Sequence, residues 1–279
     1  MSNKSNKMKS FNTVIIHVFL TAGCFLTLLP IFWMITGGFK TRAEIVKIPM
    51  VIFPEKLSFN NFVEVFKHAP FGIYYLNSII ITVMSTISII ITSTAAGYSL
   101  SKFNFKGKNL IFLLFISSMM VPFHIRMIPL YNMTLDLNLM NKLWGVIYIA
   151  LMDSFGVFLM RQFIMDIPNA YIESGRIEGA HEIKILTHII IPMCKPALSA
   201  LAILMFIWNW EWYLWPVIIL TSSEKYTLPI GLATFSGRYL TQYNLQMAAA
   251  TLVTLPVVIL FLVFQRQFVE GVVFTGIKG

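Results

Sequence analysis

Six apolar runs of about 20 residues, separated by more polar segments, set the pattern of this chain. A helix of about that length crosses the hydrocarbon layer of a bilayer. The runs are approximately Val14–Thr36, Tyr75–Leu100, Leu110–Tyr131, Leu143–Ile164, Pro196–Leu220 and Leu245–Phe264. Lipid offers no partner to backbone N–H and C=O groups, so each run is expected to be helical, and no alternating strand pattern indicates a barrel. The pattern therefore predicts an all-α integral membrane protein with six transmembrane helices.

Composition agrees with that class, because 57% of the residues are hydrophobic, 12% are charged and the mean hydropathy is +0.75. Basic residues favour the segments that lie inside when the N-terminus is cytoplasmic. The predicted organisation is a cytoplasmic tail at 1–13, a first transmembrane helix at 14–36, an extracytoplasmic loop at 37–74, a five-helix core at 75–265 and a cytoplasmic tail at 266–279. Inner loops facing anionic lipid explain the net charge of +9, so nucleic acid is not an expected partner.

The first run contains Leu20-Thr21-Ala22-Gly23-Cys24, which looks like a bacterial lipoprotein cleavage box. A cleaved segment normally ends in polar sequence, whereas this run continues in apolar residues well past Cys24. We therefore expect the first span to be retained. The only other cysteine, Cys194, is predicted to be cytoplasmic, so no disulfide framework is available.

Residues 166–193 are nearly the only long polar segment between two strongly apolar runs, and they are predicted to be cytoplasmic and to form two short helices. Pro168 suits the first turn of a helix, and Gly179 can adopt the backbone conformation that reverses the chain. The second helix is expected to carry one apolar stripe, formed by Ile183, Leu186 and Ile190. The segment therefore indicates a stiff knob that either docks on another protein or lies on the lipid surface.

The same segment reads Glu173-Ser174-Gly175, three residues, Gly179, nine residues, Ile189, one residue, Ile191-Pro192. This order resembles the cytoplasmic loop of ATP-binding-cassette (ABC) importer permeases, Glu-Ala-Ala, any three, Gly, any nine, Ile, any, Leu-Pro. Ser174, Gly175 and Ile191 depart from it by small changes of side chain. The resemblance implies that a separate ATPase subunit receives Glu173, Ser174, Gly175, Arg176, Glu178, Gly179 and Ala180.

Further short segments look like carbohydrate-importing permeases of the maltose-transporter type, among them residues 57–62, 75–78, 97–103, 128–131, 227–232 and 265–271. That resemblance implies a multi-pass protein of the bacterial cytoplasmic membrane. Its implied partners are a second permease chain or a copy of this one, two ATPase subunits that bind ATP and Mg, and an extracytoplasmic solute-binding protein. The implied solute is a sugar, an oligosaccharide or a related polyol.

No Gly-x4-Gly-Lys-Ser/Thr loop occurs in the chain, so it is not expected to hydrolyse ATP or to bind a cofactor itself. His-Glu-x-x-His, paired Cys-x-x-Cys and Gly-x-Ser-x-Gly patterns are also missing from the sequence. The residues therefore predict a transport subunit and no enzyme or metal protein.

Candidate pathway residues are Asp153, Trp208, Asn209, Glu211 and Trp212. Flat aromatic faces stack on sugar rings while Asn and Glu fix hydroxyl groups, but tryptophans at headgroup level would explain the cluster equally simply. A charge within a span is costly, so Asp153 and Glu211 are expected to face a watery path or an ion-pair partner on the second permease. Arg126, between Pro122 and Pro129, is near a span end and is interpreted as snorkelling to the interface.

Three other functions stay open at this point. The chain could be an ABC permease for another polar solute, or an ion-coupled secondary transporter that uses Asp153 and Glu211. No convincing internal repeat supports the second of these. A membrane enzyme would need a cluster of acid, base or metal-binding residues, and the sequence shows none.

Overall fold

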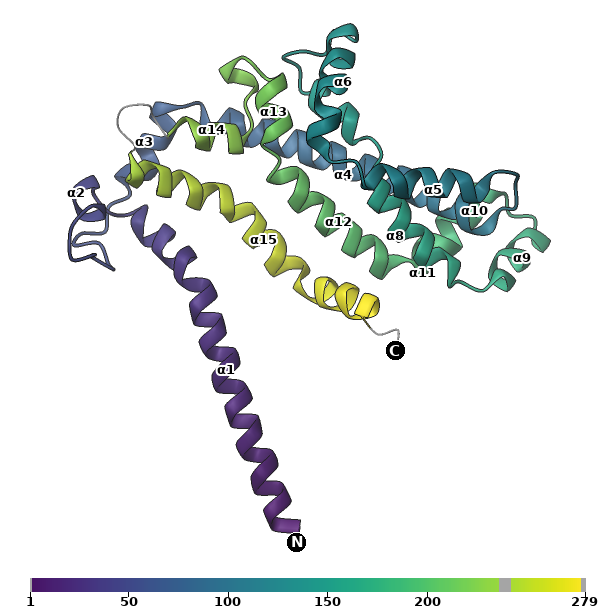
Figure 1. The fold of residues 1–279 in the computed structure, drawn as a ribbon, viewed down its shortest axis with the longest axis horizontal. Helices are drawn as coiled ribbons and strands as arrows, with labels where there is room; N and C mark the ends of the chain where they lie inside the picture. The colour runs from purple at the N-terminus through teal and green to yellow at the C-terminus, as the bar shows by residue number, and fades with distance from the viewer. Residues whose placement is uncertain (1, 236–241, 277–279) are drawn as a thin grey trace. The chain divides into compact units, whose positions relative to one another are not determined.

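Helices are the only regular secondary structure in the computed structural model, which describes residues 2–235 and 242–276 (Figure 1). Side chains are described for residues 13–235 and 242–265. The chain forms two units, one made of residues 1–69 and 232–255 and the other of residues 70–231 and 256–279. The predicted all-α class is confirmed.

Five helical segments of the described residues are long and apolar enough to cross a bilayer. They are Thr13–Gly37, Phe71–Lys102, Trp144–Met165, Lys195–Ile219 and Tyr243–Gln265. The pair Lys108–Met119 and Phe123–Asp136 passes the same test only as one span, and it is bent by 103°. The six predicted runs are therefore all present, but the third is a broken span.

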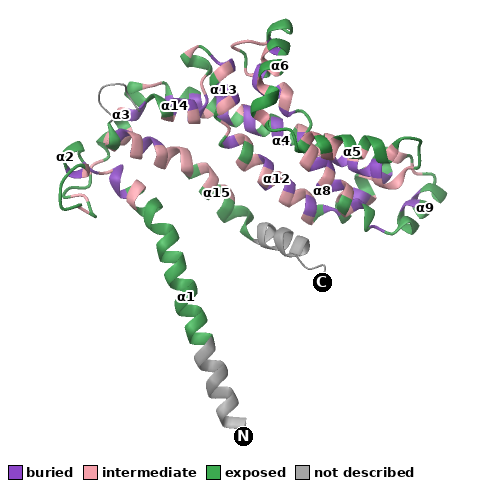
Figure 2. Ribbon diagram, in the orientation of Figure 1, coloured by how far each residue is buried: buried purple, intermediate pink, exposed green. Residues whose placement is uncertain are grey.

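The first unit is built around α1 (Ser2–Gly37), α2 (Arg42–Ile45) and α3 (Asn60–His68), with part of α15. Side chains of α1 are exposed from Thr13 to Phe32, and Figure 2 shows this as a green stretch. Most of these side chains are apolar, so lipid is the environment that suits them.

The segment after α1 was expected only as a loop, and the structure gives it internal order. The carboxylate of Glu44 accepts hydrogen bonds from the backbone N–H groups of Thr41 and Glu55, each at 2.6 Å. Lys40 is fully buried, with Nζ 2.7 Å from the carbonyl oxygen of Val51 and 3.8 Å from the ring centroid of Trp33. A buried charge is tolerated only with such partners, so these contacts fix the segment.

The second unit contains most of the remaining helices, and its longest is α4 (Phe71–Lys102). Its α-helices up to residue 219 are α5 (Lys108–Met119), α6 (Phe123–Asp136), α7 (Trp144–Ile147), α8 (Ser154–Met165), α9 (Asn169–Ile177), α10 (Glu182–Ile185), α11 (Ile191–Met193), α12 (Lys195–Trp210) and α13 (Leu214–Ile219). Short 3-10 turns η1 (Tyr148–Ala150) and η3 (Ser223–Lys225) and the π-helical η2 (Leu186–Ile190) complete this stretch.

Close packing joins α4 to α8 and α12. A Cβ atom on Gly97 of α4 would lie 2.8 Å from the backbone nitrogen of Arg161, and one on Gly156 of α8 would lie 2.4 Å from Oγ of Ser93. Only glycine permits backbones to approach this closely, as in other helix pairs inside membranes. The core beside the loop 166–193 is mostly aliphatic, with Met160, Ile164, Ile185 and Leu201 fully buried.

Three predicted spans are interrupted rather than continuous. The run Leu143–Ile164 breaks between η1, which ends at Ala150, and α8, which begins at Ser154. The run Leu110–Tyr131 breaks at Pro122, whose extended backbone precedes α6, because proline lacks the N–H that would continue α5. Pro129 is accommodated inside α6. The run Pro196–Leu220 also breaks, since α12 ends at Trp210 and α13 begins at Leu214.

Helices near both termini of the chain extend past the apolar runs that the sequence predicted. α14 (Leu228–Thr234) and α15 (Tyr243–Gly276) each begin in one unit and end in the other. The helical backbone of α15 continues past residue 265, the predicted end of the five-helix core, to Gly276. Likewise, α1 begins at Ser2, within the stretch predicted as an N-terminal tail.

Candidate functional site

The polar loop folds as two helical pieces reversed at Gly179, as the sequence predicted. α9 ends at Ile177, and Gly179 has a φ of +78°, in the left-handed region that favours glycine. The N–H of Ala180 then donates to the carbonyl oxygen of Gly175 at 2.9 Å, which closes the turn before α10 begins. A Cβ on Gly179 would meet no atom within 4 Å, so backbone conformation alone requires glycine here.

The predicted coupling residues form the outer surface of this loop. Glu173, Ser174, Arg176, Glu178 and Gly179 are exposed. Gly175 is buried and Ala180 is partly buried, so these two face the protein instead. A Cβ on Gly175 would lie 2.9 Å from Cδ1 of Ile189, which explains why the loop carries a very small residue at this position.

The predicted apolar stripe of the second helical piece is wrong at its first member. Ile183 is 69% exposed, whereas Ile185 and Ile190 are fully buried and Leu186 is partly buried. The five residues of η2 form π-helical turns, so side chains repeat at wider spacing than the 3.6-residue period used for the prediction. Ile185 and Ile190, which are five residues apart, therefore share the buried face, and Ile183 lies on the exposed face.

Glu182 is the electrostatic centre of the loop. Its carboxylate accepts a hydrogen bond from Nε of Arg176 at 2.8 Å and another from the hydroxyl of Tyr98 at 2.6 Å. These two bonds, Arg176 first, hold the pKa of Glu182 below its usual value. Tyr98 belongs to α4 and is buried, so Glu182 joins the loop to a transmembrane helix.

Lys102, the last residue of α4, binds the other end of the loop. Its Nζ donates to the carbonyl oxygen of Ile167 and, at 3.0 Å, to Oδ1 of Asn169. Asn169 is the first residue of α9. The C-terminal end of α4 therefore contacts both limbs of the loop.

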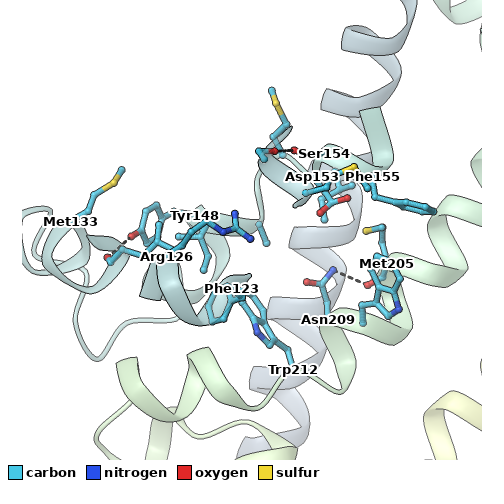
Figure 3. A pocket seen from close by; sticks show the side chains of 18 residues that line it. Phe123, Arg126, Met133, Tyr148, Asp153, Ser154, Phe155, Met205, Asn209 and Trp212 are labelled. Carbon is cyan, nitrogen blue, oxygen red and sulfur yellow. Dashed lines mark hydrogen bonds between the residues drawn. The ribbon is translucent and has the colours of Figure 1, made fainter. Parts of the chain in front are cut away.

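A cavity of about 620 Å³ lies elsewhere in the same unit, and Figure 3 shows its lining. Aromatic rings from four elements contribute to its wall: Phe123, Tyr148, Phe155, Trp208 and Trp212. Its polar residues are Ser118, Arg126, Asp153, Ser154 and Asn209. Aromatic faces combined with a few polar groups are typical of sites that bind polar organic solutes.

Four of the five candidate pathway residues line this cavity, namely Asp153, Trp208, Asn209 and Trp212. Glu211 does not, because it caps the C-terminus of α12 with an exposed side chain. The break between α12 and α13 turns the chain at this residue, so helical periodicity across it does not hold.

Two of the lining residues also support the local fold. Asp153 is the N-cap of α8, and its Oδ1 accepts a hydrogen bond from the N–H of Gly156 at 2.9 Å. That bond caps the first turn of α8. Asn209 donates to the carbonyl oxygen of Met205 at 2.8 Å, which leaves its amide oxygen facing the cavity side (Figure 3).

Arg126 lines the cavity, although the sequence led us to interpret it as snorkelling to the membrane interface. Its guanidinium lies 6.0 Å from the ring centroid of Phe123 and makes no hydrogen bond or ion pair within the described residues. Figure 3 shows it reaching toward the space in front of Asp153. The bend at Pro122 places Arg126 at the cavity. In the sequence, a charge flanked by two prolines was the feature that could have indicated this position.

Among the described residues, no group of three His, Cys, Asp or Glu side chains is arranged to hold a metal ion.

Tyr148, which the sequence analysis did not name as a candidate, is held in the cavity wall by a 2.7 Å hydrogen bond with the hydroxyl of Thr134. The cavity therefore offers binding surface from aromatic rings, hydroxyls, one carboxylate and one guanidinium.

Comparison with known proteins gives a family that agrees with this geometry. The family described as binding-protein-dependent transport system inner membrane component matches residues 88–273. The chain is 34% identical to the arabinooligosaccharides transport system permease protein of Halalkalibacterium halodurans, over 98% of this chain and 100% of that protein. It is 30% identical to the sn-glycerol-3-phosphate transport system permease protein of Pectobacterium atrosepticum, over 92% of this chain and 94% of that protein.

A solved structure shares the fold. It belongs to a bacterial ABC transporter involved in the import of the acidic polysaccharide alginate, and it matches with a TM-score of 0.81 at 24% sequence identity. The match covers 93% of this chain and 97% of the other. The permease fold predicted from the loop motif is therefore confirmed, and the chain belongs to the family of binding-protein-dependent transport system inner membrane components.

Proposed function

We propose that this chain is the permease subunit of an ATP-driven importer for a sugar, an oligosaccharide or a related polyol. The observation that carries the proposal is the cavity, in which aromatic faces and hydrogen-bonding side chains surround about 620 Å³. The two relatives compared above are transport systems for arabinooligosaccharides and for sn-glycerol-3-phosphate, and both of these solutes are rich in oxygen. Such solutes combine C–H faces that stack on aromatic rings with groups that need hydrogen bonds.

In this proposal, Trp208 and Trp212 offer stacking faces to the solute. Asp153 accepts hydrogen bonds from hydroxyl groups, while Arg126 and Asn209 provide the complementary polar contacts. Glu211 has no place in this set, because its side chain lies outside the cavity lining.

The coupling loop would meet the ATPase through its exposed residues, above all Glu173, Arg176 and Glu178. Two such cytoplasmic subunits would bind ATP and Mg, and this chain would bind neither. A second permease chain or a copy of this one would complete the path, and an extracytoplasmic solute-binding protein would deliver the solute. Both termini and the loop 166–193 would then be cytoplasmic.

Transport would follow by alternating access. Closure of the ATPase pair displaces the loop around Gly179, the transmembrane helices rearrange, and the cavity opens in turn to each side of the membrane. Differential affinity of the loop for the closed ATPase provides the free energy that shifts the helices between the two arrangements.

Reconstitution of the co-purified complex in proteoliposomes tests this function. Uptake of a labelled oligosaccharide or glycerol phosphate should require both ATP and the solute-binding protein. It should persist after ionophores collapse the proton and sodium gradients. Uptake that stops with the gradients and ignores ATP would establish an ion-coupled transporter instead.

A further inference from the structure

The loop 166–193 makes hydrogen bonds to the C-terminal end of α4, although α4 does not adjoin the loop in sequence. The chain runs directly from α8 into α9 and from η2 through α11 into α12. Those two helices therefore follow the loop through the backbone. α4 can follow it only through side-chain contacts.

These contacts occur at both limbs of the loop. On the second limb, Glu182 accepts hydrogen bonds from Tyr98 of α4 and from Arg176 of α9. On the first limb, Lys102 binds Ile167 and Asn169. Charge-assisted hydrogen bonds of this kind are directional and stronger than neutral ones.

Aromatic contacts support the same junction. The ring of Tyr98 meets Phe103 edge to face, with centroids 5.3 Å apart. The guanidinium of Arg176 lies 5.8 Å from the centroid of Phe103. Tyr98 is only 3% exposed, so its hydroxyl is held in position by packing as well as by Glu182.

The other end of the connection lies at the cavity. The hydroxyl of Ser88 on α4 donates to the carbonyl oxygen of Leu151 at 2.9 Å. The hydroxyl of Thr92, also on α4, lies 3.0 Å from the same oxygen and 2.9 Å from the carbonyl oxygen of Ser88. Leu151 directly precedes Met152 and Asp153, which line the cavity, and α4 itself contributes Ile89 to the lining. Along a helix, the ten positions from Ser88 to Tyr98 correspond to about 15 Å.

We propose that α4 moves as a rigid body and transmits motion between the ATPase-facing loop and the solute cavity. Tyr98, Glu182 and Lys102 attach it to the loop. This inference rests on the proposed function, and it assigns to these residues a positioning role in coupling rather than contact with solute or nucleotide. Loop displacement moves α4 through Glu182 and Lys102, and α4 moves the wall at Leu151 and Asp153 through Ser88 and Thr92.

The test compares ATP hydrolysis with uptake in the whole reconstituted complex, using a labelled oligosaccharide or glycerol phosphate that the unmodified complex takes up. Tyr98→Phe removes one hydroxyl and leaves the ring, so folding is retained. Glu182→Gln and Lys102→Met remove the two charges, and Lys106→Met is the matched control, because Lys106 is an exposed lysine of the same segment. Solute uptake per ATP hydrolysed should fall about fivefold or more in Tyr98→Phe and Glu182→Gln, as for loss of a typical coupling free energy.

The double variant of Tyr98 and Glu182 should be no worse than the poorer single variant, because both changes break one connection. Lys106→Met should match the unmodified complex. Unchanged uptake per ATP in Tyr98→Phe would overturn the inference. So would a parallel fall of hydrolysis and uptake, since that indicates only lost assembly. If the unmodified complex shows no ATP-driven uptake of any such solute, the proposed function fails instead.

Discussion

The close approach of α4 and α8 gives a quantitative prediction for Gly97→Ala. The new Cβ would lie 2.8 Å from the backbone nitrogen of Arg161 and 2.9 Å from Cβ of Met160, whereas ordinary contacts begin at 3.4 Å. The shortfall to the nitrogen is 3.4 minus 2.8, or 0.6 Å, and the obstructing atoms are backbone or close to it. The helices must therefore separate, and overpacking of this kind costs about 1–3 kcal/mol.

Gly72→Ala is the matched control, because it adds the same methyl group to α4 where no atom lies within 4 Å. The free energy of unfolding of Gly97→Ala should lie about 1–3 kcal/mol below that of Gly72→Ala. Thermal unfolding of the purified complex in detergent, followed by tryptophan fluorescence, measures the difference. At about 2–4 °C per kcal/mol, the midpoint should fall by roughly 2–12 °C. Equal midpoints for the two variants would refute the packing argument.

Four further outcomes follow from single contacts. Gly179→Asn should retain ATP-driven uptake and Gly179→Pro should lose it, because only the former tolerates a φ of +78°. Arg126→Gln should lower uptake roughly tenfold with ATP hydrolysis unchanged, and an unaffected uptake would remove Arg126 from the pathway. Hydrogen bonds from Glu55 and Thr41 lower the pKa of Glu44 in the folded protein. Hydrogen exchange of the segment around Glu44, corrected for intrinsic rates, should therefore stay slow above about pH 4.3, and it should accelerate as the pH falls through the lowered pKa of the folded state. Glu44→Gln should accelerate that exchange at neutral pH. Thr82→Val should raise the thermal midpoint, because its buried hydroxyl has no hydrogen-bond partner among the described residues. Thr94→Val should lower the midpoint, because that hydroxyl donates to the carbonyl oxygen of Ile90 at 2.6 Å.

Much of the fold was predictable because a bilayer imposes simple rules on sequence. Apolar runs of sufficient length locate the spans, and the spacing around Gly179 predicts the reversal of the loop. The bend at Pro122 was foreseeable in place but not in size, since proline removes a hydrogen bond without fixing the angle that results. The position of Ile183 was not predictable, because π-helical turns arise from packing and not from a local preference.

The cavity was partly predictable for a related reason. Asp153 and Trp208 drew attention as a charge and a large aromatic side chain within apolar runs, and both line the wall. Arg126 reaches it from α6 and Tyr148 from η1, so only the folded chain brings them together. Glu211 shows the converse, since a helix break can turn a charge out of the face that its neighbours share.

The distribution of contacts along α4 suggests how one helix can be both mobile and mechanically linked. Its middle is rich in buried small hydroxyl side chains, and Ser85 and Ser93 have no hydrogen-bond partner in the described part of the chain. Such a surface packs by dispersion, which is weak for each atom pair and has little directional preference. Directional bonds join α4 to Leu151 through Ser88, to the loop through Tyr98 and Lys102, and to residues 223–228 through Tyr74, Asn77 and Ser78. A displacement of α4 is therefore transmitted mainly through its directional bonds, including the bond from Nε of Arg161 on α8 to the carbonyl oxygen of Leu100, and the free energy spent on the displacement is concentrated where these bonds are formed.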